Sequence, residues 1–267
     1  MSEVRSGTVD VRGAQLYYEV RGQGDPLLLI QGGISDAAAT AQLAAELAER
    51  YQVISYDRRG ISRSTAAGDV PVTMPQHAED AARLLEACTD RPARVLGSSI
   101  GAVIALHLAA EHPGRVATVI AHEPPLSSVL REQDREAELD TVAELARTDV
   151  RGAIRHMVTI SAHQGEPEEG ARPGKPAGDP NANLEFFFAH DFPAVRASAL
   201  RAEQLAAVPV TVRPTGGSEG ASRWEYRCAQ QLAKELDGTF TEVPGGHMAP
   251  SSHPRGTAEA VRRLLAE

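Results

Sequence analysis

Hydrophobic positions in this chain come in short runs that alternate with longer segments rich in Ala, Leu and Glu. The short runs are typical of buried strands, and the longer segments repeat apolar residues at helical spacing. Thr73 is expected to cap one of the helices. The predicted strands are 9–11, 16–20, 27–30, 52–56, 93–96, 116–121, 208–212 and 239–243, and the predicted helices are 36–50, 73–88, 100–111, 222–236 and 257–265. This alternation predicts an α/β fold with a mostly parallel central sheet and helices on both faces.

The segment 125–205 departs from this pattern, because it is polar, favours helices and contains no convincing strand. Within it, 164–183 holds eight Gly and Pro residues and is expected to be a loop. A loop of this length is either functional or disordered. We predict that 125–205 is a helical insertion between two strands of one core domain, formed by 1–124 and 206–267. Without the 81 inserted residues the core has 186 residues, a usual size for one domain.

The composition excludes several classes of protein. With 42% hydrophobic and 24% charged residues, the 267-residue chain is expected to be soluble and globular. The 27 basic residues form no cluster and are outnumbered by 36 acidic ones, so nucleic acid is not an expected partner. Residues 1–10 are polar, and no stretch approaches the roughly 20 apolar residues of a membrane span. We therefore expect no signal peptide, no membrane partner and a cytoplasmic location. Cys88 and Cys228 are expected to be free thiols.

The candidate chemistry begins with Gly97-Ser98-Ser99-Ile100-Gly101, a G-x-S-x-G sequence between a predicted strand and a predicted helix. On a tight strand-to-helix turn a serine hydroxyl is exposed above the edge of the sheet, and flanking glycines permit the strained backbone. The positive end of the following helix favours developing negative charge. The glycine spacing selects Ser99, not its neighbour Ser98, as the nucleophile. The alternative interpretation is a tight turn that only requires small residues.

A serine nucleophile needs a base, and a histidine late in the chain is expected to supply it. His247 lies in Pro244-Gly245-Gly246-His247-Met248, a glycine-rich loop that can turn the imidazole over the edge of the sheet. His253 is the other late candidate, but it is expected to start the final helix. Two histidines are expected to point elsewhere from the helix after the nucleophile, namely His107 and His112. Four others are expected on the surface, namely His77, His156, His163 and His190.

With these motifs in this order, the chain resembles the α/β-hydrolase family over nearly its whole length. The resemblance includes Gln31-Gly32-Gly33 after the third strand. It also includes the turn Asp57-Arg58-Arg59-Gly60-Ile61-Ser62-Arg63-Ser64 after the fourth, to which we assign a structural role only. The resemblance implies an oxyanion hole formed by the backbone N–H groups of Gly33 and Ile100. Gln31 stands where many members carry histidine, which leaves the backbone donor in place and changes the contacts offered to a substrate.

Two glutamates compete for the role of the acid that holds the histidine tautomer. Glu219 lies in the glycine-rich stretch 214–220, where most members of the family place the acid. Glu123 lies one strand earlier, where some members place it, and Pro124 is expected to keep Glu123 extended in a rigid loop. The sequences His122-Glu123-Pro124 and Gly245-Gly246-His247 also resemble the lactonases that open the macrolactone zearalenone, whose acid is a glutamate at this earlier position. We favour Glu123 and keep Glu219 as the alternative.

The resemblance also implies that the insertion 125–205 is a cap over the nucleophile. Phe186-Phe187-Phe188 holds three of the five phenylalanines of the chain. At least two of them are expected to pack inside the cap, and one or more to line an apolar pocket. Trp224 is a further candidate for the pocket wall. The candidate substrate-binding residues are Gln31, Gly32, Ser98, Met157, Phe187, Phe188 and Met248.

The sequence therefore predicts a serine hydrolase that cleaves a carboxylic ester or lactone through an acyl-enzyme intermediate. Ser99, His247 and Glu123 form its predicted triad. The expected partner is a small apolar substrate, no metal or organic cofactor is expected, and a homodimer is compatible with the sequence. The alternatives are a C–C bond hydrolase with the same triad and a ligand-sensing protein with little turnover. An epoxide hydrolase or dehalogenase of this fold would need an aspartate at position 99.

Overall fold

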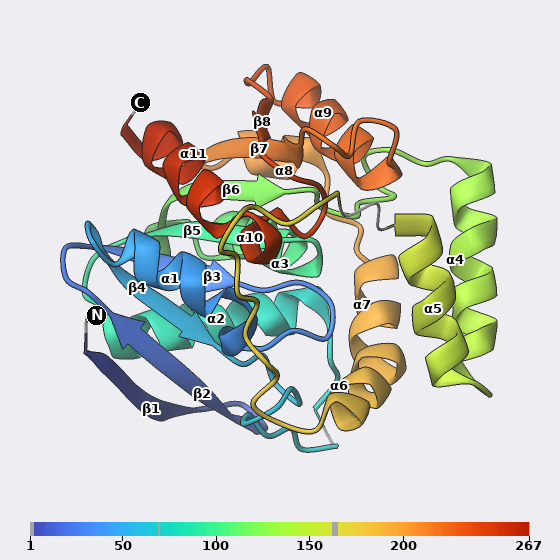
Figure 1. Cartoon of the computed structure of the whole chain (residues 1–267), viewed down its shortest axis with the longest axis horizontal. Coiled ribbons are helices and arrows are strands. Elements are labelled where there is room, and N and C mark those ends of the chain that lie inside the picture. The colour runs from blue at the N-terminus through green and yellow to red at the C-terminus, as the bar shows by residue number, and fades with distance from the viewer. Residues whose placement is uncertain (1–2, 69, 162–164, 267) are drawn as a thin grey trace.

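An eight-stranded sheet in the order β1-β2-β4-β3-β5-β6-β7-β8 runs through the middle of the protein (Figure 1). The structure is a computed structural model and describes residues 3–68, 70–161 and 165–266. β1 and β2 form an antiparallel hairpin, β2 is antiparallel to β4, and all pairings from β4 to β8 are parallel. The strands are β1 (Val4–Val11), β2 (Ala14–Arg21), β3 (Asp25–Ile30), β4 (Tyr51–Tyr56), β5 (Ala93–Ser98), β6 (Val116–His122), β7 (Thr211–Gly217) and β8 (Thr241–Val243). The predicted α/β class is confirmed.

Helices cover both faces of the sheet because its central strands direct alternate apolar side chains into two layers. Leu28 and Ile30 of β3 belong to the larger apolar cluster, which includes α2 (Met74–Cys88) and α3 (Ile100–Glu111). Leu27 and Leu29 belong to a second cluster with α1 (Ala41–Leu47) and α11 (Pro254–Ala266). The helix α9 (Trp224–Glu235) packs beside β7. The carboxyl ends of the parallel strands thus meet at one edge of a sheet that is apolar on both faces.

Most predicted elements lie at their expected positions, and the differences concern a few boundaries. Thr73 caps α2, as predicted, by accepting a backbone N–H from Gln76 at 3.1 Å. The predicted helix 36–50 is divided into the 3-10 helix η1 (Ala37–Thr40) and α1. The predicted strand 208–212 is wrong, because β7 runs from Thr211 to Gly217. Pro214 is tolerated inside this strand because it pairs with β6 alone there, and the pairing with β8 begins only at Thr215.

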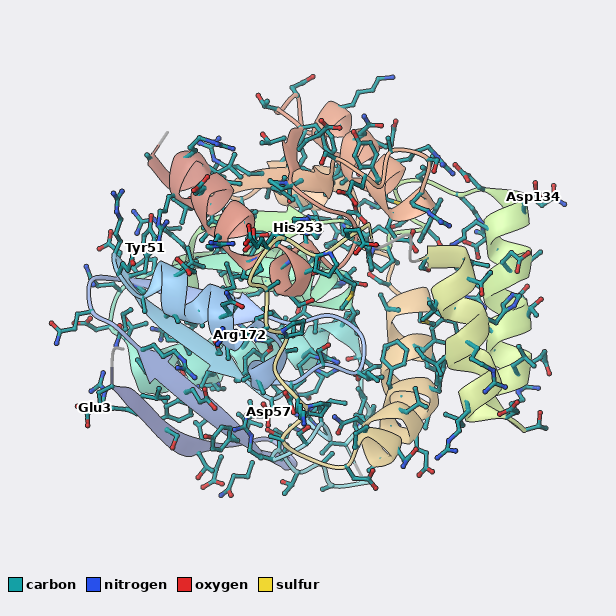
Figure 2. The ribbon with its side chains drawn as sticks, in the orientation of Figure 1. Glu3, Tyr51, Asp57, Asp134, Arg172 and His253 are labelled. Carbon is teal, nitrogen blue, oxygen red and sulfur yellow. The ribbon has the colours of Figure 1, made fainter. Side chains whose placement is uncertain are left out.

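Between β6 and β7 the chain forms helices, and the described part of it contains no strand. The elements are α4 (Gln133–Ala146), α5 (Val150–Ser161), α6 (Pro180–Phe186), the π-helix η3 (Phe187–Asp191), α7 (Phe192–Arg196) and α8 (Ala202–Ala206). In Figure 1, α4, α5 and α7 stand together beyond the carboxyl ends of the parallel strands. Figure 2 shows Asp134 of α4 and Glu3, which precedes β1, pointing outward at opposite ends of the view. Two short helices remain, η2 (Pro113–Arg115) and α10 (Ala249–Ser252). None of the helices in the described ranges has the length and hydropathy that a bilayer crossing requires.

Residues 165–179, which we call the connecting segment, form neither helix nor strand. They are the part of the predicted loop 164–183 that the structure describes before α6 begins, and residue 164 lies outside the described residues. The Glu168 carboxylate accepts the backbone N–H groups of Arg255 at 2.8 Å and Gly256 at 3.1 Å, in the first turn of α11. Further along, the N–H of Ala177 donates to Asp36 Oδ2 at 2.7 Å. These contacts fasten the connecting segment to the core, and Figure 1 shows it passing in front of the core towards α6.

Candidate active site

Ser99 stands between β5 and α3 on the strained turn that the sequence predicts. Its φ of 55° lies in the left-handed region, which L-residues other than glycine seldom adopt. The turn is tight, because a Cβ built at Gly97 would lie 2.2 Å from the carbonyl oxygen of Gly101. A Cβ at Gly101 would lie 2.2 Å from the carbonyl oxygen of Ile30 in β3. Both glycines of the motif are therefore required by close backbone contacts, and Ser99 is left at the carboxyl edge of the sheet.

His247 and Glu123 come together although they are 124 positions apart in the chain. The imidazole Nδ1–H of His247 donates to Glu123 Oε2 at 2.7 Å. The second carboxylate oxygen, Oε1, accepts the backbone N–H of Gly217 at 2.8 Å, at the end of β7. Glu123 is fully buried, and the His247 side chain is 11% exposed. Since Nδ1 is engaged by the carboxylate, Nε2 is the nitrogen that can act as a base.

The structure brings Glu123, and not Glu219, into contact with the histidine. Glu219 is exposed, and its backbone N–H donates to the Gly245 carbonyl at 2.9 Å. The expectation that Pro124 keeps Glu123 extended is wrong, because the φ of Glu123 is 48°. Its N–H donates to the Thr215 carbonyl at 2.9 Å, so β7 holds both its backbone and its carboxylate. These bonds stabilise a conformation that costs about 1–2 kcal/mol in an L-residue.

The opposite charges of Glu123 and protonated His247 stabilise each other. Burial disfavours the imidazolium, but the hydrogen bond and the charge of Glu123 outweigh it and raise the pKa of His247. Burial likewise disfavours the Glu123 carboxylate, yet the hydrogen bond from His247, with the N–H of Gly217, lowers the pKa of this carboxyl. The neighbouring His122 is buried, and desolvation lowers its pKa. The arrangement thus favours a carboxylate that can stabilise a positive charge on His247.

The loop after β3 lies against the nucleophile. A Cβ at Gly32 would lie 2.9 Å from Ser99 Cβ and 2.9 Å from the carbonyl oxygen of Ser98. Gly33 has a φ of 48°, and the space where its Cβ would point is open. The N–H of Ile100 belongs to the first turn of α3, where N–H groups have no partner inside the helix. Gly33 and Ile100 are therefore suited to the predicted role of backbone donors, and both border the same cavity as Ser99 and His247.

Arg58 binds the loop after β3 through two of its carbonyl oxygens. Its guanidinium is fully buried and donates to the carbonyl oxygen of Gln31 at 2.8 Å and to the carbonyl oxygen of Gly33. The Gln31 side chain in turn donates from Nε2 to Thr40 Oγ1 at 2.9 Å. Backbone and side chain of the loop are therefore tied to their surroundings, which fixes the direction of the N–H groups that face the cavity.

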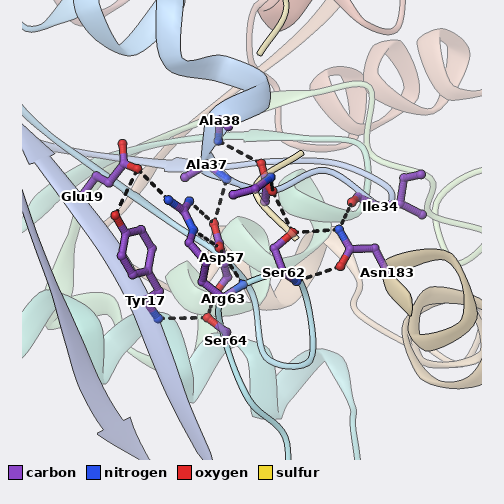
Figure 3. Close-up of polar contacts among 12 residues, drawn as sticks. Tyr17, Glu19, Ile34, Ala37, Ala38, Asp57, Ser62, Arg63, Ser64 and Asn183 are labelled. Carbon is purple, nitrogen blue, oxygen red and sulfur yellow. Dashed lines mark hydrogen bonds and ion pairs between the residues drawn. The ribbon is translucent and has the colours of Figure 1, made fainter. Parts of the chain in front are cut away.

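The turn 57–64 organises the same region through Asp57 and Ser62, as Figure 3 shows. Asp57 accepts from the N–H of Ala37 at 3.0 Å and from Arg63 Nε at 2.7 Å. The N–H of Ser62 donates to Asn183 Oδ1 of α6 at 2.7 Å. The turn therefore connects β4 with η1 and with the helices between β6 and β7, and none of its residues borders the cavity.

A cavity of about 330 Å³ lies between the sheet edge and the helices that follow β6. Six of the predicted substrate-binding residues border it, namely Gln31, Gly32, Ser98, Met157, Phe187 and Met248. Trp224 borders it as well. The seventh, Phe188, does not: it packs edge-to-face against Phe187 with ring centroids 5.1 Å apart. Phe186 also lies elsewhere, since its ring covers Gly60.

Sequence reasoning missed several residues of the cavity wall, among them Phe192, Arg135, Ser161 and Glu225. Phe192 lies five positions after Phe187, and its N–H bonds to the Phe187 carbonyl across the π-helix. The wider turn brings both rings to the cavity, whereas an α-helix turns residues five apart away from each other. A pattern search at α-helical spacing therefore gives no signal for this pair.

Of the remaining histidines, those within the described residues do not border the cavity. The surface assignment of His77 is wrong: it is buried, and its Nε2 lies 2.9 Å from Asp191 Oδ1. His253 lies directly before α11, as predicted, and its ring packs where a Cβ on Gly245 would point. His107 in α3 contacts Glu111 and Ser198. His163 lies outside the described residues.

The fold, with Ser99, His247 and Glu123 at one edge of the sheet, is the one expected for the family that the sequence resembles. A comparison with known families agrees. The family model described as alpha/beta hydrolase fold matches residues 25–251. The matched span begins at β3 and includes Ser99, Glu123 and His247. The chain belongs to the α/β-hydrolase family.

Individual relatives add detail. The uncharacterized hydrolase YraK of Bacillus subtilis is 33% identical over 267 residues, covering 98% of this chain and 96% of that protein. The putative carbamate hydrolase RutD of Azorhizobium caulinodans is 40% identical over 104 residues, which are 39% of this chain and 38% of that protein. Among solved structures, the enol-lactonase from Burkholderia xenovorans LB400 has a TM-score of 0.74 and 18% identity, covering 98% of this chain and 100% of that chain. At this identity the structural likeness shows the fold alone.

Proposed function

We propose that this chain is a serine hydrolase that cleaves a carboxylic ester or lactone through an acyl-enzyme intermediate. The observation that supports this most directly is the 2.7 Å bond between His247 Nδ1 and Glu123, next to a cavity that Ser99 also borders. Among the described residues no hydrogen bond joins Ser99 Oγ to His247. Such bonds are often long before substrate binds and shorten in the complex.

In the proposed reaction Ser99 Oγ attacks the carbonyl carbon of the substrate while His247 Nε2 takes the hydroxyl proton. The carbonyl oxygen becomes an oxyanion that the N–H groups of Gly33 and Ile100 stabilise, each worth about 10²–10³ in rate. The resulting imidazolium gives its proton to the departing alkoxide, and its charge is balanced by Glu123. A water molecule, deprotonated by His247, then attacks the acyl-serine, and the imidazolium returns this proton to Ser99 Oγ as the acid leaves.

The cavity supports a small apolar substrate. Apart from the triad and the loop after β3, its wall is largely aliphatic and aromatic, with Leu139, Met157, Phe187 and Phe192 coming from the helices between β6 and β7. We propose that 125–205 acts as a cap on the core formed by 1–124 and 206–267. A roof of this kind excludes water around the reacting carbonyl and so strengthens the hydrogen bonds to the oxyanion.

A serine-directed probe and a replacement of the nucleophile test the proposal. The protein is incubated with a fluorophosphonate and, separately, with p-nitrophenyl butyrate and a small lactone. Labelling and turnover should be lost in Ser99→Ala and retained in Ser222→Ala, which alters an exposed serine outside the cavity. Labelling or hydrolysis that persists in Ser99→Ala would overturn the mechanism. Faster Ser99-dependent turnover of a matched p-nitrophenyl carbamate would overturn the choice of ester.

A further inference from the structure

An ion pair of two buried side chains forms part of the cavity wall. Arg135 comes from α4 and Glu225 from the first turn of α9, so the pair joins the helices after β6 to the core. Both residues border the cavity, and their side chains are only 8% and 3% exposed. Arg135 Nη2 donates to Glu225 Oε1 and, at 2.7 Å, to Ser161 Oγ at the end of α5. Arg135 Nη1 donates to the carbonyl oxygen of Ile160 at 3.2 Å.

Each member of the pair keeps one polar atom without a partner. Among the residues that the structure describes, Arg135 Nε and Glu225 Oε2 are buried and make no hydrogen bond. A buried polar atom without a partner has lost its hydrogen bonds to water without replacing them, and the loss is larger when the group is charged. The buried Arg58 has an Nε of the same kind, but Arg135 is distinguished by bordering the cavity beside an acceptor that also lacks a partner. Together the two residues hold one donor and one acceptor that no other described group uses.

The chemistry of the pair selects the kind of group that fits it. A substrate carboxylate could accept from Arg135 but would be repelled by Glu225, and an ammonium group would meet the reverse problem. A hydroxyl is neutral and both donates and accepts, so it satisfies both residues. Most other residues of the cavity wall are apolar, among them Trp224, whose ring centroid lies 5.1 Å from the Arg135 guanidinium carbon, and the polar ones include Ser161 and Arg196. A hydroxyl bound here would therefore be the main polar feature of an otherwise apolar substrate.

We propose that Arg135 and Glu225 form a hydroxyl-binding subsite, which makes the substrate an ester or lactone that carries a free hydroxyl group. The inference rests on the proposed function, because it concerns the substrate of the same cavity. The pair also links α4, α5 and α9. Loss of this structural link alone would lower the stability of the protein, but it would not change which substrate is preferred.

The experiment compares substrates that differ only in the hydroxyl. Hydrolysis of methyl hexanoate, of its hydroxylated derivatives with the hydroxyl at each chain position, and of monomethyl adipate is followed by acid release. For the wild-type protein, kcat/KM of the best hydroxylated ester should exceed that of methyl hexanoate and of monomethyl adipate by about tenfold or more. In Arg135→Met/Glu225→Leu, which removes both charges and nearly keeps the volume, the ratio of hydroxylated to plain ester should fall to about one. Both substrates are measured on the same protein sample. A smaller fraction of folded protein therefore lowers both rates equally and leaves their ratio unchanged.

A matched control separates selectivity from stability. Arg59→Met/Asp80→Leu removes another buried ion pair, with an Nε–Oδ2 distance of 2.6 Å, that does not border the cavity. It should lower stability and leave the substrate ratio unchanged. If the Arg135 double variant does not fold, Glu225→Gln, which keeps the shape of the side chain, is used in its place. A wild-type protein that hydrolyses these esters through Ser99 without preferring any hydroxylated one overturns this inference alone. Absence of any Ser99-dependent hydrolysis would instead count against the proposed function.

Discussion

Arg58 and Asp191 form an ion pair across the boundary between the core and the helices that follow β6. Arg58 Nη2 lies 3.1 Å from Asp191 Oδ2, and both side chains are fully buried. Asp191 ends the π-helix η3, and its second oxygen contacts His77 at 2.9 Å. Because Arg58 also donates to the carbonyl oxygens of Gln31 and Gly33, Asp191 is linked through one side chain to the candidate oxyanion loop.

This link predicts that Asp191→Asn reduces turnover although Asp191 does not border the cavity. Without the carboxylate, Arg58 is an unpaired buried charge, which costs about 3–5 kcal/mol of stability. Any shift of Arg58 moves the loop that carries the Gly33 N–H, so kcat should fall by roughly tenfold or more while KM changes little. Steady-state kinetics, corrected for the fraction of protein labelled by a fluorophosphonate, measure this effect.

The control is Asp80→Asn, which breaks the equally buried pair with Arg59. It should lower the melting temperature by a similar amount and leave kcat unchanged per labelled site. Equal losses of kcat in the two variants would show that Asp191 acts only through stability.

Replacement of each candidate acid should distinguish Glu123 from Glu219. Glu123→Gln removes the charge that stabilises the imidazolium, and such a change lowers kcat by about 10⁴ in serine hydrolases with an aspartate. Glu219→Gln changes an exposed side chain and should leave kcat within a factor of about two. The two variants are compared with the same p-nitrophenyl ester. A large loss in Glu219→Gln with a small loss in Glu123→Gln would reverse the assignment.

The pH dependence follows from the charge of Glu123. His247 must be neutral to accept the Ser99 proton, so kcat/KM should fall as the pH drops through the pKa of His247. Since contacts with Glu123 raise this pKa, the midpoint of the acidic limb should lie above the ordinary histidine value of about 6.5. Glu123→Gln should move the midpoint to lower pH. A pH–rate profile of both proteins checks this, and a wild-type midpoint below the ordinary value would contradict it.

The core of the fold and two members of the proposed triad could be predicted because they depend on local sequence. Ser99 is identified by glycines that the turn requires at fixed spacing, and His247 by a loop that follows the last strand. The positions of most strands and helices along the chain were predictable for the same reason, since short apolar runs alternate with amphipathic helices. The boundary of β7 was not predictable. Pro214 and two glycines are unusual in a strand, and the strands that pair with β7 lie far away in the chain.

The remaining parts of the candidate site depend on contacts that one sequence does not encode locally. Arg135 and Glu225 are 90 positions apart, and each alone resembles a solvated charge. His77 looks like a surface residue until Asp191, 114 positions later, is placed against it. The choice between the two glutamates was open because both loops meet at one sheet edge. The backbone of Glu123 also has a positive φ that Pro124 alone does not predict.

Gly32 should be intolerant of even one added methyl group. A Cβ there would lie 2.9 Å from both Ser99 Cβ and the Ser98 carbonyl oxygen, closer than carbon and oxygen atoms pack, so either the loop or the nucleophile must move. Displacements of about 1 Å in an active site can cost about 10² in rate. Gly32→Ala should therefore lower kcat about a hundredfold. Gly114→Ala, where the same atom would meet open space, should leave kcat unchanged. The rate of fluorophosphonate labelling compares the two directly, and an unaltered rate in Gly32→Ala would show that the loop after β3 is not held against Ser99 in solution.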